Sequence, residues 1–253
     1  MGSATYQDLA GKSVLITGGG SGIGAEFVRA FVGQGANVAF VSLPDDPGEE
    51  LALEVEKVTG TKPLFLPCDV RDIAALKNAI EQARDVQGPI SVLVNNAARD
   101  DRHDILSLDE AAWDNSFAIN LRPHYFTVQA CAEDMKASGG SIINLGSNSA
   151  NLGLAGYPAY VAAKAGIVGL TKALARELGT HGIRVNALIP GWVMTERQKE
   201  LWATPEAVEA CLRDQSLKKT ISEGDIANAA LFLASEASSM MSGQSLIVDG
   251  GRV

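Results

Sequence analysis

The feature that most constrains the fold of this chain is a regular alternation between short apolar segments and longer amphipathic ones. Apolar runs of four or five residues are typical of strands buried on both faces of a sheet. They occupy residues 14–17, 38–41, 63–66, 92–95, 142–145, 185–189 and 245–248. Helical periodicity lies between several of them, as at 22–33, 48–59, 72–86 and 158–178. Because strands that alternate with helices form parallel sheets through right-handed crossovers, the sequence predicts an α/β fold. We expect a single doubly wound, Rossmann-type domain whose mostly seven-stranded parallel sheet is flanked by helices.

The chain is interpreted as one domain, because no linker or charge block divides residues 1–253. Its least regular stretch, about 192–222, holds Trp192, Trp202 and Pro205. Long insertions in compact domains are often functional, which makes this stretch a candidate substrate lid. Ordinary surface helices explain the same pattern equally well.

The composition restricts the partners and the compartment. A formal net charge of −9 argues against nucleic acid and anionic membranes as partners, since both require a basic surface. Three dispersed cysteines (Cys68, Cys131 and Cys211) are typical of reduced thiols in a cytoplasmic protein. The sequence has no cluster of metal-ligating residues at ligand spacing, so we expect no metal site. We expect neither a secretory signal peptide nor a membrane span.

A glycine-rich loop joins the first expected strand to the first expected helix. Glycine lets the backbone turn sharply and lets a pyrophosphate approach the helix N-terminus, where unpaired N–H groups and the helix dipole favour negative charge. A structural turn explains such a loop taken alone, but its position between a strand and a helix favours a dinucleotide. The loop residues expected to contact the cofactor are Gly18, Gly20, Ser21, Gly22, Ile23 and Gly24.

The loop has the spacing TGxxxGxG rather than GxGxxG, and further motifs follow it in order. They are Asn95-Asn96-Ala97-Ala98, Asn120, Ser147, the Tyr160-xxx-Lys164 pair, Pro190-Gly191 and a terminal VDGG. Together they resemble the short-chain dehydrogenase/reductase family over nearly the whole chain, with Ala98 in place of the usual glycine. The resemblance implies an enzyme that transfers a hydride to or from a nicotinamide cofactor.

Two residues of this set share one helix face. Tyr160 and Lys164 are four positions apart, which places them one turn from each other. A free tyrosine has a pKa of about 10, and a nearby ammonium favours its phenolate, as would the charge of an oxidised nicotinamide. The resemblance implies that Tyr160 is the base and that Lys164 also binds the nicotinamide ribose. It further implies that Ser147 donates to the substrate oxygen, and that Asn120 positions a water relaying the proton from Lys164.

The end of the second expected strand should meet the adenine ribose. Ser42 occupies the position that discriminates between the two nicotinamide cofactors, and Asp45 and Asp46 follow it. These acids would repel a 2′-phosphate, so the sequence favours NAD and leaves NADP open. Asp69 is expected at the adenine ring or, alternatively, as a helix cap before Ile73. The remaining expected cofactor contacts are Val70, Asn96, Ala97, Tyr160, Lys164, Pro190, Gly191, Val193 and Thr195, the last also a candidate helix cap.

A finer resemblance concerns the substrate. The loop 95–103, the segment 142–147 and the stretch 197–205 are similar to bacterial aldose dehydrogenases, notably those acting on D-xylose. This implies oxidation of the C1 hydroxyl of a cyclic sugar to a lactone. The residues expected to contact the sugar are Arg99, Arg102, His103, Asn148 and Trp192. A self-paired, solvated charge run is the alternative for 99–103. The two arginines of that run would also suit an anionic sugar such as a uronate or a sulfonated hexose.

Two other functions remain open at this point. One is a different activity of the same family, such as a polyol, secondary-alcohol, steroid or 3-oxoacyl reductase; Ser21 disfavours the last, which commonly carries a basic residue there. The other is a dinucleotide-binding regulator without catalysis, which the complete set of Asn120, Ser147, Tyr160 and Lys164 disfavours. The expected helix at 158–178 is apolar or small on most faces, so it should be buried on more than one side. The family resemblance implies that such a helix forms a twofold interface of a homotetramer, with burial within one subunit as the alternative.

Overall fold

The computed structural model describes residues 4–253 and confirms the expected fold. Seven strands form one parallel sheet in the order β3-β2-β1-β4-β5-β6-β7. They are β1 (Ser13–Thr17), β2 (Asn37–Ser42), β3 (Leu64–Pro67), β4 (Val92–Asn95), β5 (Gly140–Leu145), β6 (Ile183–Pro190) and β7 (Ser245–Val248). Each expected strand is present, with ends within two residues of the prediction. The strand order reverses between β1 and β4, which opens a crevice at their carboxyl ends.

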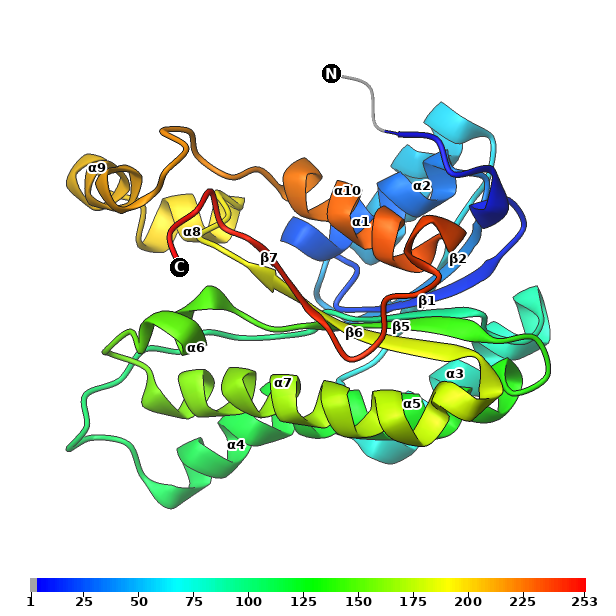
Figure 1. Cartoon of the computed structure of the whole chain (residues 1–253), viewed down its shortest axis with the longest axis horizontal. Coiled ribbons are helices and arrows are strands. Elements are labelled where there is room, and N and C mark those ends of the chain that lie inside the picture. Colours follow the sequence, from blue (N-terminus) through cyan, green and yellow to red (C-terminus); the bar gives the residue numbers. More distant parts are fainter. Residues whose placement is uncertain (1–3) are drawn as a thin grey trace.

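Helices cover both faces of the sheet (Figure 1). One layer holds α1 (Gly22–Gly33), α2 (Gly48–Thr59) and α10 (Glu223–Ala234). The other holds α3 (Ile73–Gln87), α4 (Glu110–Asn120), α5 (Arg122–Met135) and α7 (Pro158–Leu178). Short 3₁₀ turns complete the chain at η1 (Gln7–Leu9), η2 (Gly179–His181) and η3 (Glu236–Ser238).

Each face of the sheet has its own core. Along β1, Val14 and Ile16 point into the layer that contains Phe27 and Phe31 of α1, whereas Leu15 points into the opposite layer. Successive strand residues face opposite sides, so a strand covered on both faces must be apolar throughout. This explains why the strands appear in the sequence as uninterrupted apolar runs. Burial of each large side chain stabilises the fold by about 1.5–3 kcal/mol.

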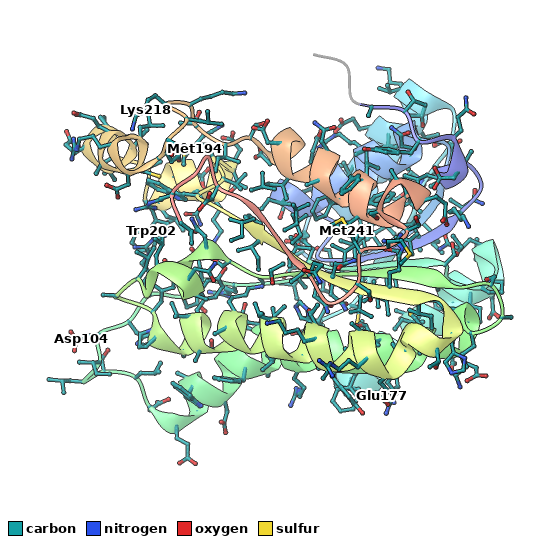
Figure 2. The ribbon with its side chains drawn as sticks, in the orientation of Figure 1. Asp104, Glu177, Met194, Trp202, Lys218 and Met241 are labelled. Carbon is teal, nitrogen blue, oxygen red and sulfur yellow. The ribbon has the colours of Figure 1, made fainter. Side chains whose placement is uncertain are left out.

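The stretch 192–222 forms two short helices beyond the carboxyl end of β6. They are α8 (Glu196–Leu201) and α9 (Pro205–Asp214), each begun by a threonine whose hydroxyl accepts a backbone N–H, Thr195 and Thr204. Figure 1 shows them at the same end of the molecule as α6 (Asn148–Leu152). In Figure 2, Trp202 lies between this helical segment and the loop that carries Asp104.

Within residues 4–253, no helix is long and apolar enough to cross a membrane. Across the same residues, no group of three or more histidine, cysteine or acidic side chains is arranged to hold a metal ion. Cys68, Cys131 and Cys211 are buried free thiols.

Candidate active site

A cavity of about 880 Å³ lies at the carboxyl ends of the strands, where the strand order reverses. Its wall comes from the glycine-rich loop, the ends of β2, β4, β5 and β6, the start of α7, and α8. The volume lies within the range that small-molecule and cofactor sites occupy. Open parallel sheets bind ligands at such a crevice, so this cavity is the candidate active site.

The glycine-rich loop requires its glycines for steric reasons. Gly18 and Gly22 have positive φ angles of 67° and 51°. A Cβ on Gly24 would lie 1.8 Å from the carbonyl oxygen of Gly18, so α1 begins in close contact with the loop. Asn96 fixes this arrangement by donating from Nδ2 to the carbonyl oxygens of Thr17 at 3.1 Å and Gly18 at 2.9 Å.

The same loop suits a pyrophosphate. The side chain of Ser21, which precedes α1, makes no capping hydrogen bond, so it leaves the first N–H groups of the helix available to an anion. Gly18, Ser21, Ile23 and Gly24 line the cavity. Gly20 and Gly22 instead line a neighbouring hollow that also borders Ser21. The loop therefore fits a dinucleotide.

Beyond the loop, the cavity wall at Ser42 carries the carboxylate of Asp46. The hydroxyl of Ser42 accepts from the N–H of Gly20 at 3.2 Å and donates to the carboxylate of Asp46. Both Ser42 and Asp46 line the cavity.

The Arg71 guanidinium beside Asp69 lowers the pKa of that carboxyl. Asp69 does not cap α3; Asp72 does, by accepting from the N–H of Ala75 at 3.0 Å.

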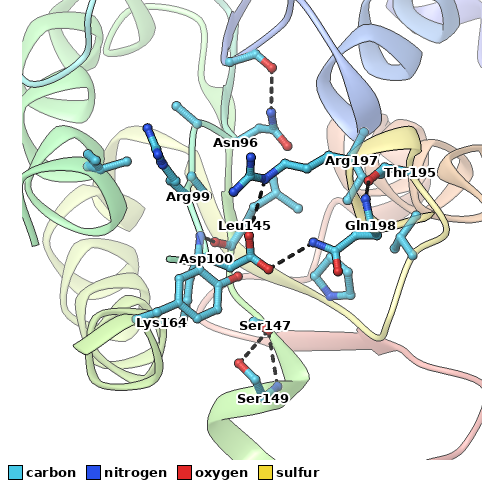
Figure 3. A pocket seen from close by; sticks show the side chains of 18 of the residues that line it. Asn96, Arg99, Asp100, Leu145, Ser147, Ser149, Lys164, Thr195, Arg197 and Gln198 are labelled. Carbon is cyan, nitrogen blue, oxygen red and sulfur yellow. Dashed lines mark hydrogen bonds and ion pairs between the residues drawn. The ribbon is translucent and has the colours of Figure 1, made fainter. Parts of the chain in front are cut away.

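Three of the proposed catalytic side chains, Ser147, Tyr160 and Lys164, line the same cavity, and Figure 3 labels Ser147 and Lys164. Ser147 follows β5 and begins α6, with its Oγ 2.8 Å from the hydroxyl of Ser149. Lys164 is 1% exposed and donates from Nζ to the carbonyl oxygen of Leu145 at 2.7 Å. Its Nζ lies 5.7 Å from the centre of the Tyr160 ring. The spacing of four residues thus places the two side chains together, as expected.

Burial opposes ionisation of both groups. It raises the pKa of the Tyr160 hydroxyl, an effect that the nearby Ser147 hydroxyl partly offsets. Burial also lowers the pKa of Lys164 to about 7. In the protein without ligand, desolvation therefore dominates the pKa of Tyr160. A phenolate here requires additional positive charge or hydrogen-bond donors in the cavity.

Asn120 lies behind the cavity wall rather than in it. It is fully buried; its Oδ1 accepts from the N–H of Arg99 at 2.9 Å and its Nδ2 donates to the carbonyl oxygen of Arg99 at 3.0 Å. It therefore fixes the backbone where the 99–103 loop begins. The remaining expected cofactor contacts line the cavity: Val70, Asn96, Ala97, Pro190, Gly191, Val193 and Thr195. Thr195 also caps α8, as its alternative role predicted.

Four of the five expected sugar contacts line the cavity, namely Arg99, Arg102, Asn148 and Trp192. His103 does not: its backbone N–H donates to the carbonyl oxygen of Gly156 at 2.8 Å. The self-paired alternative holds for Arg99, whose Nε lies 2.7 Å from Asp101. It fails for Arg102, whose guanidinium carbon lies 4.9 Å and 4.1 Å from the ring centres of Tyr157 and Trp202.

Sequence reasoning missed the contacts that join this loop to α8. Gln198 donates from Nε2 to Asp100 at 3.0 Å and accepts from the indole N–H of Trp192 at 2.9 Å. Arg197 approaches the other oxygen of Asp100 at 3.7 Å. Figure 3 shows Asp100 between Arg197 and Gln198. The candidate lid is thus hydrogen-bonded to the opposite rim of the cavity.

Two further cavity residues were not singled out. Tyr157 directly precedes α7, three residues before Tyr160, with the two ring centres 5.5 Å apart. The spacing of three was a signal for a shared helix face. Arg252 enters the cavity from the C-terminal segment, and no local sequence pattern indicates it.

Comparisons with known proteins agree with this geometry. A family model described as enoyl-(acyl carrier protein) reductase matches residues 18–252. A Rhizobium meliloti protein named "Probable galactose dehydrogenase GalD" is 45% identical over 250 residues, which are 98% of each chain. The D-xylose 1-dehydrogenase of Caulobacter vibrioides is 43% identical over 252 residues, 99% of each chain. A solved short-chain type dehydrogenase/reductase from Mycobacterium ulcerans has a TM-score of 0.91 at 27% identity, with 98% of this chain and 91% of that chain covered. These findings confirm the family resemblance that the motifs carry.

Proposed function

Because this chain is an oxidoreductase of the short-chain dehydrogenase/reductase family, we propose that it oxidises the C1 hydroxyl of a cyclic aldose to the lactone, with NAD as hydride acceptor. The observation that carries the proposal is the meeting of Ser147, Tyr160 and Lys164 at the inner end of a cavity with a polar rim. The names of the similar galactose and D-xylose dehydrogenases support a sugar as the substrate.

The residues present divide the reaction into separate tasks. A nicotinamide held along the glycine loop would supply the two-electron acceptor for the hydride from C1. Ser147 donates a hydrogen bond to the substrate oxygen, and the Tyr160 phenolate accepts the hydroxyl proton as the carbonyl forms. Lys164 favours that phenolate when its amine is protonated, and the Leu145 carbonyl fixes its Nζ. Asn120 lies behind the cavity wall and is a positioning residue, because it holds the backbone at the start of the 99–103 loop.

The choice of NAD rests on the wall at Ser42. A ribose 2′-hydroxyl can donate to the carboxylate of Asp46, whereas a 2′-phosphate would place two negative charges together. The nearby Arg71 is already paired with Asp69. This arrangement supports a preference for NAD over NADP.

A homotetramer in the cytoplasm remains the expected state. Only one stripe of α7 is buried within the chain, and Ala165 and Gly169 on other faces are exposed. Small exposed residues permit close approach of a second helix, which supports an interface there.

The test is the absorbance of reduced nicotinamide with purified protein. NAD and NADP are each offered with neutral and acidic aldoses, their C1-blocked methyl glycosides, an acyclic polyol and a secondary alcohol. We expect reduction of NAD by an aldose and none by its glycoside. Equal activity with the glycoside, or activity on the acyclic alcohols alone, would contradict oxidation at C1.

A further inference from the structure

The cavity is basic although the chain is acidic. The formal net charge is −9, yet five arginines and Lys164 line the cavity against three aspartates. Four of the arginines have carboxylate neighbours: Arg71 pairs with Asp69, Arg99 with Asp101, Arg197 with Asp100 and Arg252 with Asp214. Arg102 and Arg252 lie beside the candidate sugar site, and we call them the arginine pair.

Arg102 is exposed and has no acidic partner in the described chain. Between residues 4 and 253, no carboxylate lies within 4.0 Å of its guanidinium, and its side chain makes no hydrogen bond. Tyr157 and Trp202 hold the group by their ring faces instead, at 4.9 Å and 4.1 Å. Stacking uses the faces of the planar guanidinium and leaves its in-plane N–H donors available to an anion.

Arg252 is only half satisfied. One terminal nitrogen lies 3.2 Å from Asp214, and the side chain is 16% exposed. Its Nε is buried and has no hydrogen-bond partner in the described part of the chain. Arg102 stacks on the ring of Trp202, whose indole nitrogen is also buried and has no hydrogen-bond partner in the described part of the chain. Buried donors without partners are rare in folded proteins, and here they border a ligand cavity.

The arginine pair lies close to the proposed reaction centre. Arg102 lies 4.9 Å from the centre of the Tyr157 ring, and Arg252 lines the same cavity; the positive charges of both oppose the effect of burial on the pKa of Tyr157. The Tyr157 ring in turn lies 5.5 Å from that of Tyr160. A sugar whose C1 hydroxyl contacts Tyr160 would therefore extend its far end past Tyr157 toward the arginine pair.

We propose that the arginine pair binds an anionic group on the sugar, and that the preferred substrate is an aldose with a carboxylate or sulfonate at the carbon farthest from C1. This inference rests on the proposed function. A planar guanidinium can give two parallel hydrogen bonds to two oxygens of such a group, and charge-assisted bonds of this kind are the strong ones. Asp100, a cavity acid near this end, is engaged on one oxygen by Arg197 at 3.7 Å and on the other by Gln198 at 3.0 Å, and it forms no ion pair with Arg102 or Arg252 in the described chain.

The test compares matched substrates on the native enzyme. Glucuronate, galacturonate and 6-sulfonated glucose are each measured against glucose and galactose, and each uronate against its uncharged primary amide. We expect kcat/KM to favour the anionic member by about tenfold to a hundredfold, the range of one charge-assisted hydrogen bond. Comparison of the uronates with the sulfonated glucose shows whether the site prefers a carboxylate or a sulfonate.

Variants then assign the preference to the arginine pair. Arg102→Gln should lower the acid-to-amide ratio of kcat/KM by about tenfold, and Arg252→Gln should act in the same direction. Arg213→Gln is the matched control, because Arg213 is an exposed α9 arginine paired with Glu209 outside the cavity. If Arg252→Gln does not fold, the Arg102→Gln ratio and the acid-to-amide comparison still decide.

The outcomes are distinguishable. Equal kcat/KM for acid and amide, or a variant that lowers both alike, overturns the anion site while the proposed sugar oxidation stands. Absence of turnover with every sugar overturns the proposed function instead. In that case the Kd of acid and amide, measured by calorimetry with NAD present, still tests the anion site, and equal Kd values refute it.

Discussion

Replacement of Lys164 by methionine should stabilise the fold while it abolishes activity. The amine is fully buried without a carboxylate partner in the described chain, and its pKa falls from 10.5 to about 7. Each pKa unit corresponds to about 1.4 kcal/mol, so holding the charged amine in the folded state costs about 5 kcal/mol. Methionine has nearly the same length and removes this cost, but it leaves the Leu145 carbonyl without the Nζ hydrogen bond, a loss of about 1 kcal/mol.

The stability gained by Lys164→Met should decrease as the pH rises above about 7. Below about pH 7 the amine is protonated in both states, and the native protein carries the full penalty. Between about pH 7 and 10.5 the unfolded chain binds a proton that the folded chain does not, so native stability rises with pH. Above that window the lysine is neutral in both states. The advantage of Lys164→Met should therefore be largest near pH 7 and shrink as pH approaches 10.

The assay is thermal unfolding of the cofactor-free protein at about pH 7 and pH 9.5. Allowing for incomplete relaxation, we expect a net gain of about 2–4 kcal/mol near pH 7, which raises Tm by about 5–15 °C in a chain of this size. Groups other than Lys164 titrate in both proteins, so the difference between them isolates this amine. A destabilised Lys164→Met, or an advantage independent of pH, would refute the argument from desolvation.

Three further predictions follow from the same cavity. Tyr160→Phe should lower kcat about 10²- to 10⁴-fold yet keep NAD affinity, measured by nicotinamide fluorescence; normal turnover would remove it as the base. Asp46→Asn should raise kcat/KM for NADP about tenfold relative to NAD, and an unchanged ratio would mean that the 2′-position lies elsewhere. Gln198→Leu should raise the KM for sugar several-fold through loss of its bond to Asp100, with cofactor KM as the internal control.

The fold was predictable because its signals are local. A strand covered on both faces must be apolar throughout, and this pattern located all seven strands. The first-turn glycines and the spacing of Tyr160 and Lys164 are equally local, since each reports on one loop or one helix face. The helices α4 and α5 gave weaker signals, because polar residues such as Asn120, His124 and Thr127 are buried in them.

The rim of the cavity was less predictable because its charged side chains contact residues that are far away in the sequence. In sequence, the run from Arg99 to His103 allows complete pairing among its own members, and that alternative remained open. In the structure only Arg99 follows it, while Asp100 turns to Gln198, 98 residues away. Removing Asp100 from the run leaves Arg102 without a local acid, and the two aromatic rings that hold it come from still other segments. The same contacts that tie α8 to the opposite rim therefore leave the Arg102 guanidinium available to a ligand, which is what the proposed anion site requires.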